Sequence, residues 1–265
     1  MDKKTKIKNL KITIIQSDVA WENKALNIIH FGELVSDIQT ETNLIILPEM
    51  FTTGFTMKPE KFSEELNGET VNWMKSIAKS KNTTVIGSII ISDNNEYYNR
   101  LLSVDFKGNC LFYDKRHLFR MGNEHNNYSN GSERLIVDIN HWKICPLICY
   151  DLRFPVWSRN KGDYDILIYI ANWPETRREI WITLLMARAI ENQCYVVGVN
   201  RIGVDGNAIS YSGDSIVVNP KGTIISGTKP YKESVETIEL SLDELTEFRQ
   251  KFPVGLDADN FKIIG

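Results

Sequence analysis

The sequence predicts an α/β fold in which helices cover a mixed β-sheet or a pair of sheets. Along the 265 residues, short apolar runs rich in β-branched side chains alternate with amphipathic segments of helical period. Some strand-like runs are separated by a helix, as in parallel βα units, whereas others follow one another across a short turn, as in antiparallel hairpins. No Pro-, Gly- or Ser-rich linker and no low-complexity tract breaks this alternation. We therefore expect one domain over residues 1–265.

The first part of the chain alternates strands with helices. Residues 10–16 predict an apolar strand, and residues 23–39 have the period of an amphipathic helix. The wholly apolar run 44–47 predicts a short buried strand that ends at Pro48. The same pattern then repeats, with a helix at 70–80 and a β-branched strand at 84–91.

Hairpins and another βα unit are predicted for the rest of the chain. A core-facing apolar stripe marks a helix at 178–192, which lies between strand-like runs at 166–170 and 195–200. A strand at 235–240 is followed by a helix through Phe252. Turn-forming residues separate three further pairs of strands, at 99–105 and 110–113, at 135–138 and 142–148, and at 214–218 and 223–226.

The composition is that of a globular protein with a sizeable core, and it argues against several functions. Hydrophobic residues make up 42% and charged residues 25% of the chain. A net charge of −3 and a pI of about 5.9 give no electrostatic basis for binding nucleic acid or an acidic membrane. The single basic run, from Lys3 to Lys11, is interpreted as a solvated leader. We expect neither a membrane span nor a signal peptide, since the apolar runs are too short for either.

The four cysteines lie in or beside apolar runs, so we expect reduced thiols in a cytoplasmic protein rather than a secreted disulfide scaffold. Cys149 stands out because it ends an apolar strand and opens the polar run C-Y-D-L-R-F-P. Nucleophiles occupy such strand-to-helix turns, where free N–H groups at a helix N-terminus favour a thiolate and can hold an oxyanion. We therefore expect Cys149 to be a nucleophile, and we assign Cys110, Cys145 and Cys194 to packing.

A nucleophilic thiol needs a base and a partner for the oxyanion. Glu49 follows the strand at 44–47 and is the candidate general base, while Lys115 follows the strand at 110–113 and is the candidate cation. Glu49, Lys115 and Cys149 each end a predicted central strand, and such ends gather in one crevice of an α/β sheet. The four histidines lie in a helix, a turn or a polar loop and are less well placed to act as the base: His30, His117, His125 and His141.

The segments around Glu49, Lys115 and Cys149 together resemble the nitrilase, or carbon–nitrogen hydrolase, superfamily. The resemblance extends from the first strand to about Pro220. Longer strings resemble the bacterial omega-amidase branch, whose members hydrolyse the terminal amide of 2-oxoglutaramate and related 2-oxo acid amides. The strings are M-G-N-E-H-N-N-Y-S-N-G at 121–131, C-Y-D-L-R-F-P-V-W-S-R-N at 149–160, A-N-W-P at 171–174 and R-A-I-E-N-Q-C-Y at 188–195.

The resemblance implies a four-layer α-β-β-α sandwich that pairs into a homodimer through a helical face, and an amidase without a metal or organic cofactor. The family's glutamate, lysine and cysteine map onto Glu49, Lys115 and Cys149, and a second glutamate that orients the lysine and the substrate maps onto Glu124. The implied reaction converts 2-oxoglutaramate or 2-oxosuccinamate to the acid and ammonia through an acyl-thioester. In this hypothesis Glu49 moves the protons, while Lys115 and the backbone N–H of Tyr150 hold the oxyanion.

Substrate binding is predicted from the chemistry of a 2-oxo acid amide. Such a substrate carries a carboxylate, for which Arg153 is the candidate partner; an ion pair with Asp151 or another nearby acid is the alternative role for Arg153. Four other residues are expected near the substrate, with Asn172 and Trp173 as lining and Phe119 and Tyr128 as a lid. Packing is the alternative role for Trp173.

Other interpretations stay open. Within the superfamily, the substrate is alternatively another small amide, such as deaminated glutathione, an N-carbamoyl compound or a short monocarboxylic amide. An inactive member serving as a scaffold would lack one of the three catalytic residues, and none is missing. A remote alternative is a thiol redox or metal-binding protein that uses Cys145 and Cys149. On one strand these two residues would lie about 13 Å apart, too far for a disulfide or a shared metal.

Overall fold

Two β-sheets packed face to face form the centre of the structure, a computed structural model that describes residues 9–263. Each sheet is mixed, with three parallel strands in its middle and antiparallel strands outside them. The larger sheet has the order β13 (Ser234–Leu240), β1 (Leu10–Gln16), β2 (Leu44–Ile46), β3 (Thr84–Asp93), β4 (Glu96–Val104) and β5 (Cys110–Asp114). The smaller sheet has the order β12 (Ile216–Val218), β9 (Tyr195–Asn200), β8 (Ile166–Ala171), β7 (Trp142–Ile148) and β6 (Val137–Ile139).

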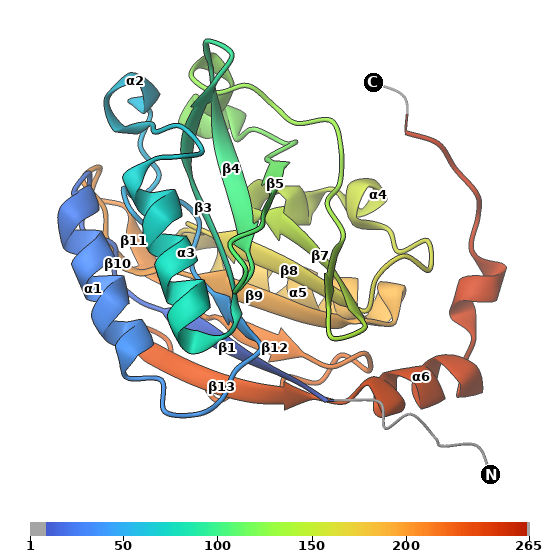
Figure 1. The fold of residues 1–265 in the computed structure, drawn as a ribbon. Helices are drawn as coiled ribbons and strands as arrows, with labels where there is room; N and C mark the ends of the chain where they lie inside the picture. The colour runs from blue at the N-terminus through green and yellow to red at the C-terminus, as the bar shows by residue number, and fades with distance from the viewer. Residues whose placement is uncertain (1–8, 264–265) are drawn as a thin grey trace.

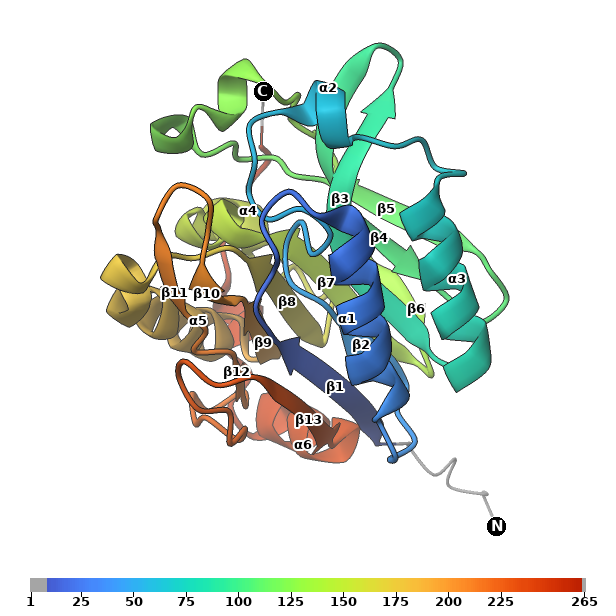
Figure 2. The same ribbon diagram turned by 90° about the vertical axis from the view of Figure 1, so that its left-hand side faces the viewer.

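Helices cover the outer face of each sheet. α1 (Lys24–Ser36) and α3 (Glu69–Lys81) lie side by side over the larger sheet, and α5 (Arg178–Asn192) lies over the smaller one (Figures 1 and 2). This order of layers confirms the α-β-β-α sandwich. The other helical segments are α2 (Pro59–Phe62), α4 (Pro155–Ser158), α6 (Leu242–Lys251) and five 3₁₀ turns, η1 (Arg120–Gly122), η2 (Glu124–Asn126), η3 (Cys149–Arg153), η4 (Glu175–Arg177) and η5 (Val254–Asp257).

The two faces of β1 show how the sequence builds these layers. Ile12 and Ile14 point into the core between the sheets, where Leu147 of β7 also lies. Ile15 points to the opposite face and packs in a second core with Phe31 of α1. Successive strand residues alternate between faces, so a strand that is buried on both sides needs an almost continuous apolar run.

The structure corrects the predicted hairpins in three places. β3 and β4 form a long hairpin that was not predicted, whose turn residues Asn94 and Asn95 both have positive φ, as in a type I′ turn. A short hairpin of β10 (Ile202–Val204) and β11 (Ser210–Ser212) was also missed, because three-residue strands leave little periodicity. The predicted strand at 223–226 makes only a single bridge, from Ile224 to Val218. The hairpins β4–β5 and β6–β7 are confirmed.

Of the basic run predicted as a leader, Lys3, Lys4, Lys6 and Lys8 lie outside the described residues. Among the described helices, none is both long and apolar enough to cross a membrane.

Gly198 of β9 offers a test of how α5 packs on the smaller sheet. A Cβ at this position would lie 2.4 Å from Leu185 Cδ1 and 2.8 Å from Trp181 Cζ2, closer than packed atoms can approach. Gly198→Ala should therefore lower the free energy of unfolding by about 1–3 kcal/mol in urea denaturation followed by circular dichroism. Gly255→Ala is the matched control, because its Cβ would meet nothing within 4 Å. Equal effects of the two substitutions would contradict the α5–β9 contact.

Candidate active site

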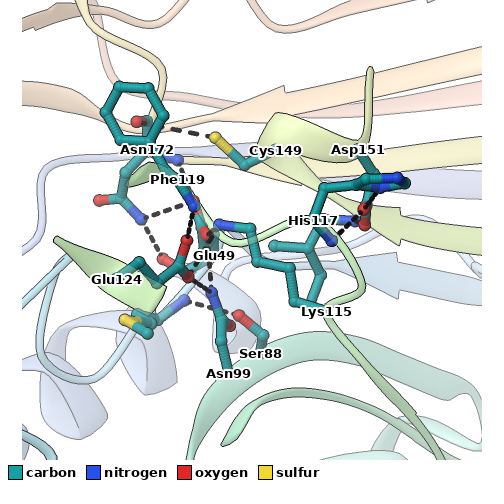
Figure 3. Close-up of polar contacts among 12 residues, drawn as sticks. Glu49, Ser88, Asn99, Lys115, His117, Phe119, Glu124, Cys149, Asp151 and Asn172 are labelled. Carbon is teal, nitrogen blue, oxygen red and sulfur yellow. Dashed lines mark hydrogen bonds and ion pairs between the residues drawn. The ribbon is translucent and has the colours of Figure 1, made fainter. Parts of the chain in front are cut away.

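The candidate site lies where strands of both sheets end. Glu49 follows β2 and Lys115 follows β5 in the larger sheet, whereas Cys149 follows β7 and Asn172 follows β8 in the smaller one (Figure 3). The face-to-face packing of the sheets brings these four side chains together. The site therefore depends on the contact between the sheets as well as on each sheet.

A buried ionic cluster forms the centre of the site. The Lys115 ammonium lies 2.8 Å from Glu49 Oε1 and 3.0 Å from Glu124 Oε1, and all three side chains are fully buried. Asn99 of β4 donates from Nδ2 to the same two oxygens, at 2.7 Å and 3.2 Å. The backbone N–H of Asn172 donates to Glu49 Oε2 at 2.7 Å, and that of Phe119 donates to Glu124 Oε2 at 2.6 Å. Each carboxylate oxygen is thus paired, as buried charges require.

The charges in this cluster determine where protons can be held. Burial acts to lower the pKa of Lys115, but the charges of Glu124 and Glu49 outweigh it and hold this pKa above its usual value, so the ammonium persists. Burial raises the pKa of Glu124; the Lys115 ammonium lowers it and the Glu49 charge raises it, and the result lies above the usual range. Two carboxylates share one cation, so the cluster is suited to accept a further proton.

Cys149 begins the turn η3 with a φ of +42°, a left-handed conformation that costs a residue with a side chain about 1–3 kcal/mol. Its sulfur lies 3.9 Å from the carbonyl oxygen of Asn172. Burial and the Glu49 charge raise the pKa of this thiol well above its usual value, although the Lys115 ammonium acts in the opposite direction. Burial and the Glu49 charge thus favour the thiol over the thiolate, opposite to the influence expected of a helix N-terminus.

The Cys149 thiol opens into a cavity of about 490 Å³. Lys115 also lines this cavity, beneath the ring of Phe55, whose centroid is 5.1 Å from the ammonium. Two arginines lie in the cavity wall, with Arg153 5.2 Å from the Trp173 ring and Arg177 5.5 Å from the Phe119 ring. Neither of these guanidinium groups has a carboxylate partner among residues 9–263. The cavity thus combines a thiol, an ammonium and two guanidinium groups.

The structure places most of the predicted substrate contacts around this cavity. Tyr150, Arg153, Trp173 and Phe119 all line it. Trp173 lines the cavity and also has a packing role, because it is only 3% exposed and donates from Nε1 to the carbonyl oxygen of Arg177 at 2.9 Å.

Two expectations need correction, and Asn172 has an additional role. Tyr128 is not part of the lid: it packs in a small core with Met50 and donates its hydroxyl hydrogen to a backbone carbonyl at 2.7 Å. Asn172 lines the cavity as expected, and its side-chain amide also donates to the backbone oxygen of Glu49 at 2.6 Å, which helps to hold Glu49 in place. The alternative ion pair of Arg153 with Asp151 is absent from the described residues, since Asp151 is bonded to other groups.

Sequence reasoning missed three residues of the site. Asn99 carried a usable signal, because an amide in the middle of a buried strand needs partners. Phe55 lies in the same loop as Glu49, and Arg177 follows the A-N-W-P string, but neither position distinguishes a cavity residue from a surface one.

Comparisons with known proteins agree with this arrangement. A family model described as carbon–nitrogen hydrolase matches residues 11–250. The chain belongs to the carbon–nitrogen hydrolase family. This hydrolase is 47% identical to omega-amidase YafV of Escherichia coli K12, over 96% of this chain and 98% of that protein. It is also 32% identical to the 2-oxoglutaramate amidase of Bacillus subtilis, over 92% of this chain and 95% of that protein.

A solved structure shares both the fold and much of the sequence of this carbon–nitrogen hydrolase. XC1258 of Xanthomonas campestris, a CN-hydrolase superfamily protein with an arsenic adduct in its active site, superposes with a TM-score of 0.94. The two chains are 41% identical, and the match covers 97% of this chain and 99% of the other. The remote alternative, a metal site at Cys145 and Cys149, finds no support, because Cys145 is buried in the core and residues 9–263 contain no group of three metal-ligating side chains.

Replacing Lys115 by Met would leave two carboxylates buried without their cation. Lys115→Met should lower the free energy of unfolding by about 3–5 kcal/mol near pH 8, measured by urea denaturation. The pKa of Glu124, already above its usual range, would lose the lowering influence of Lys115, so the folded variant would bind protons that unfolded glutamates release. The difference in the free energy of unfolding between Lys115→Met and the unmodified protein should therefore shrink as the pH falls toward the usual glutamate pKa of about 4.3.

Lys58→Met is the matched control for this substitution. Lys58 makes an exposed ion pair with Glu22 at 3.0 Å, and the loss of such a pair costs at most about 1 kcal/mol. A Lys115→Met deficit that stays constant with pH, or that equals the Lys58→Met deficit, would contradict the buried cluster.

Proposed function

We propose that this hydrolase is an omega-amidase that converts 2-oxo dicarboxylic acid monoamides, such as 2-oxoglutaramate and 2-oxosuccinamate, to the dicarboxylic acid and ammonia. One observation carries the proposal: Cys149 and Lys115, which belongs to the buried cluster with Glu49 and Glu124, line a cavity whose wall has two arginines with no carboxylate partner among residues 9–263. A substrate with an amide at one end and a carboxylate at the other matches both parts of this cavity. The identity to omega-amidase YafV supports the same substrate class.

The first half of the reaction forms an acyl-thioester. Glu49 takes the proton of the Cys149 thiol as the sulfur attacks the amide carbonyl carbon, so the high pKa of the free thiol matters less than the nearby base. The Lys115 ammonium and the backbone N–H of Tyr150 hold the oxyanion, and each such donor contributes roughly 10²–10³ in rate. When the carbon–nitrogen bond breaks, Glu49 gives its proton to the nitrogen, which leaves as ammonia.

The second half hydrolyses this thioester. Glu49, again a carboxylate, takes a proton from water as its oxygen attacks the thioester carbonyl carbon. The carbon–sulfur bond then breaks, and the sulfur recovers a proton from Glu49, which restores both groups. Glu124, Asn99 and Asn172 do not exchange protons in this scheme; their hydrogen bonds keep Lys115 and Glu49 in position.

The carboxylate end of the substrate is assigned to Arg153 and Arg177. Both guanidinium groups lie over aromatic rings of the cavity wall, and within residues 9–263 no carboxylate occupies their N–H donors. Phe119 and Trp173 form the apolar sides through which the short carbon chain would pass. Glutamine would place its 2-ammonium group near the same two arginines, where like charges repel. We therefore expect a 2-oxo acid amide to be preferred over the 2-amino acid amide.

We further propose a single-domain homodimer located in the cytoplasm. α5 presents Ile180 and Ile190 to solvent, and a contact between helical faces would bury these apolar side chains. The cysteines, all free thiols in the structure, fit a reducing compartment. The family model spans most of the chain, which is consistent with one domain. Multi-angle light scattering on the purified protein measures the assembly directly.

Ammonia release tests the proposed reaction. The purified protein should release ammonia from 2-oxoglutaramate much faster than it releases ammonia from glutamine or cysteinylglycine from deaminated glutathione, and Cys149→Ala should abolish the release. Cys145→Ala is the matched control, because Cys145 is buried in the core away from the cavity. Hydrolysis of deaminated glutathione in preference to 2-oxoglutaramate would reject the omega-amidase proposal and keep the amidase chemistry.

Substitution of the two arginines tests carboxylate recognition. Arg153→Met and Arg177→Met should each raise KM for 2-oxoglutaramate by about 10-fold or more, since a charged hydrogen bond contributes about 1.5–3 kcal/mol. Hydrolysis of butyramide, which has no carboxylate, provides the reference and should change little. Equal losses of activity on 2-oxoglutaramate and butyramide would mean that the arginines maintain the structure of the cavity and do not bind the substrate carboxylate.

A further inference from the structure

A second buried polar cluster lies beside the catalytic residues and takes no part in the scheme above. At its centre is Asp151, a fully buried carboxylate that accepts four hydrogen bonds. Its Oδ1 accepts from the backbone N–H of His117 at 3.1 Å and from the ring Nδ1 of His117 at 2.7 Å. Its Oδ2 accepts from the Tyr113 hydroxyl at 2.7 Å and from the backbone N–H of Ile148 at 3.1 Å.

These contacts connect the two catalytic segments at equivalent places. His117 lies two residues after Lys115, and Asp151 lies two residues after Cys149. Lys115 extends from the larger sheet and Cys149 from the smaller one, so the His117–Asp151 contact crosses between the sheets. Figure 3 shows the pair on the side of Lys115 away from Glu124. Glu49 and Glu124 therefore hold the Lys115 ammonium, whereas Asp151 holds the main chain two residues further along, at His117.

The backbone contacts of Asp151 are the ones that matter for geometry. The N–H of Ile148 belongs to the residue directly before Cys149, and the N–H of His117 belongs to the segment that carries Lys115. One carboxylate thus fixes the main chain on both sides of the reacting groups. It also closes the turn η3, in which Cys149 adopts its strained φ of +42°.

The surroundings make this carboxylate rigid. The Tyr113 hydroxyl, which donates to Asp151, itself accepts from Trp157 Nε1 at 3.1 Å and from the backbone N–H of Arg116 at 3.2 Å. The His117 ring stacks on Phe154, with centroids 3.8 Å apart and planes inclined by 4°. The two side chains that donate to Asp151, those of Tyr113 and His117, are therefore held in place by other groups, as positioning requires.

We propose that His117 and Asp151 form a positioning pair that sets the separation between the Lys115 ammonium and the Cys149 sulfur. His117 is neither a base nor a substrate contact, because its ring faces Asp151 and it does not line the catalytic cavity. It acts through the hydrogen bond from Nδ1, which orients the Asp151 carboxylate toward the two backbone N–H groups. The inference rests on the roles proposed above for Lys115 and Cys149.

Two substitutions of His117 separate its hydrogen bond from its stacking. His117→Asn keeps an N–H donor near the position of Nδ1 but removes the ring. His117→Phe keeps a ring that can stack on Phe154 but removes the donor. The pair of variants is therefore matched, and far-UV circular dichroism checks that each one folds.

Two readouts are measured on each variant. The first is kcat and KM for 2-oxoglutaramate, and the second is the rate at which iodoacetamide alkylates Cys149, followed by peptide mass spectrometry. Cys110, a partly exposed thiol on the same strand as Tyr113, is an internal control for damage to β5. The alkylation readout needs no substrate, so it tests the pair even if the protein fails to hydrolyse 2-oxoglutaramate and the proposed function is rejected.

The positioning role predicts different results for the two variants. His117→Phe should lower kcat and the alkylation rate of Cys149 by about 10- to 100-fold with KM nearly unchanged, because small misplacements at a reacting centre are costly. His117→Asn should keep most of both rates, and Cys110 labelling should stay constant in both. Unchanged rates in His117→Phe, or equal losses in the two variants, would overturn the proposal.

Tyr113→Phe keeps the inference testable if His117→Phe does not fold. This change removes one of the four donors to Asp151 while preserving the aromatic ring in the core. It should lower kcat and Cys149 alkylation together, with KM nearly unchanged. Wild-type values of both rates in this variant would count against the positioning pair.

Discussion

The lysine ammonium buried between two carboxylates is the interaction on which the rest of the site depends. An ammonium without partners would be too costly at the position of Lys115, and the two glutamates would be equally costly without it. Together, Lys115, Glu49 and Glu124 form a cluster with one fewer positive than negative charge, which is suited to gain a proton and then lose it again. This is the property that a thiol nucleophile with a high pKa requires of its neighbours.

The sandwich architecture explains how this cluster meets its nucleophile. The glutamates and the lysine come from the side of the larger sheet, whereas Cys149 and Asn172 follow strands of the smaller sheet. The apolar layer between the sheets therefore acts as a spacer that determines the distance between base and nucleophile. The strained backbone of Cys149 is tolerated because η3 is hydrogen-bonded through the Asp151 carboxylate at its start and packed against the core.

The sequence predicted the strand-end residues well, because apolar runs that stop at Glu49, Lys115 and Cys149 are visible without coordinates. It did not predict the raised pKa of the Cys149 thiol, since burial and neighbouring charges depend on the contact between the sheets. Local patterns also could not reveal Arg177, or the bond that turns Asn172 toward Glu49, because both depend on packing across many residues. For the same reason, the sequence wrongly predicted Tyr128 as a lid residue, whereas the fold places it in a small core.

Rapid-quench mass spectrometry of the intact protein tests the central claim most directly. The protein is mixed with 2-oxoglutaramate, quenched with acid during turnover, and digested to locate any added mass. A thioester mechanism predicts one acyl group of the substrate, without its nitrogen, on the peptide that contains Cys149, and a loss of this adduct as the substrate is consumed. Turnover without an adduct on Cys149, or an adduct on another residue, would contradict a thioester formed beside the Lys115 cluster.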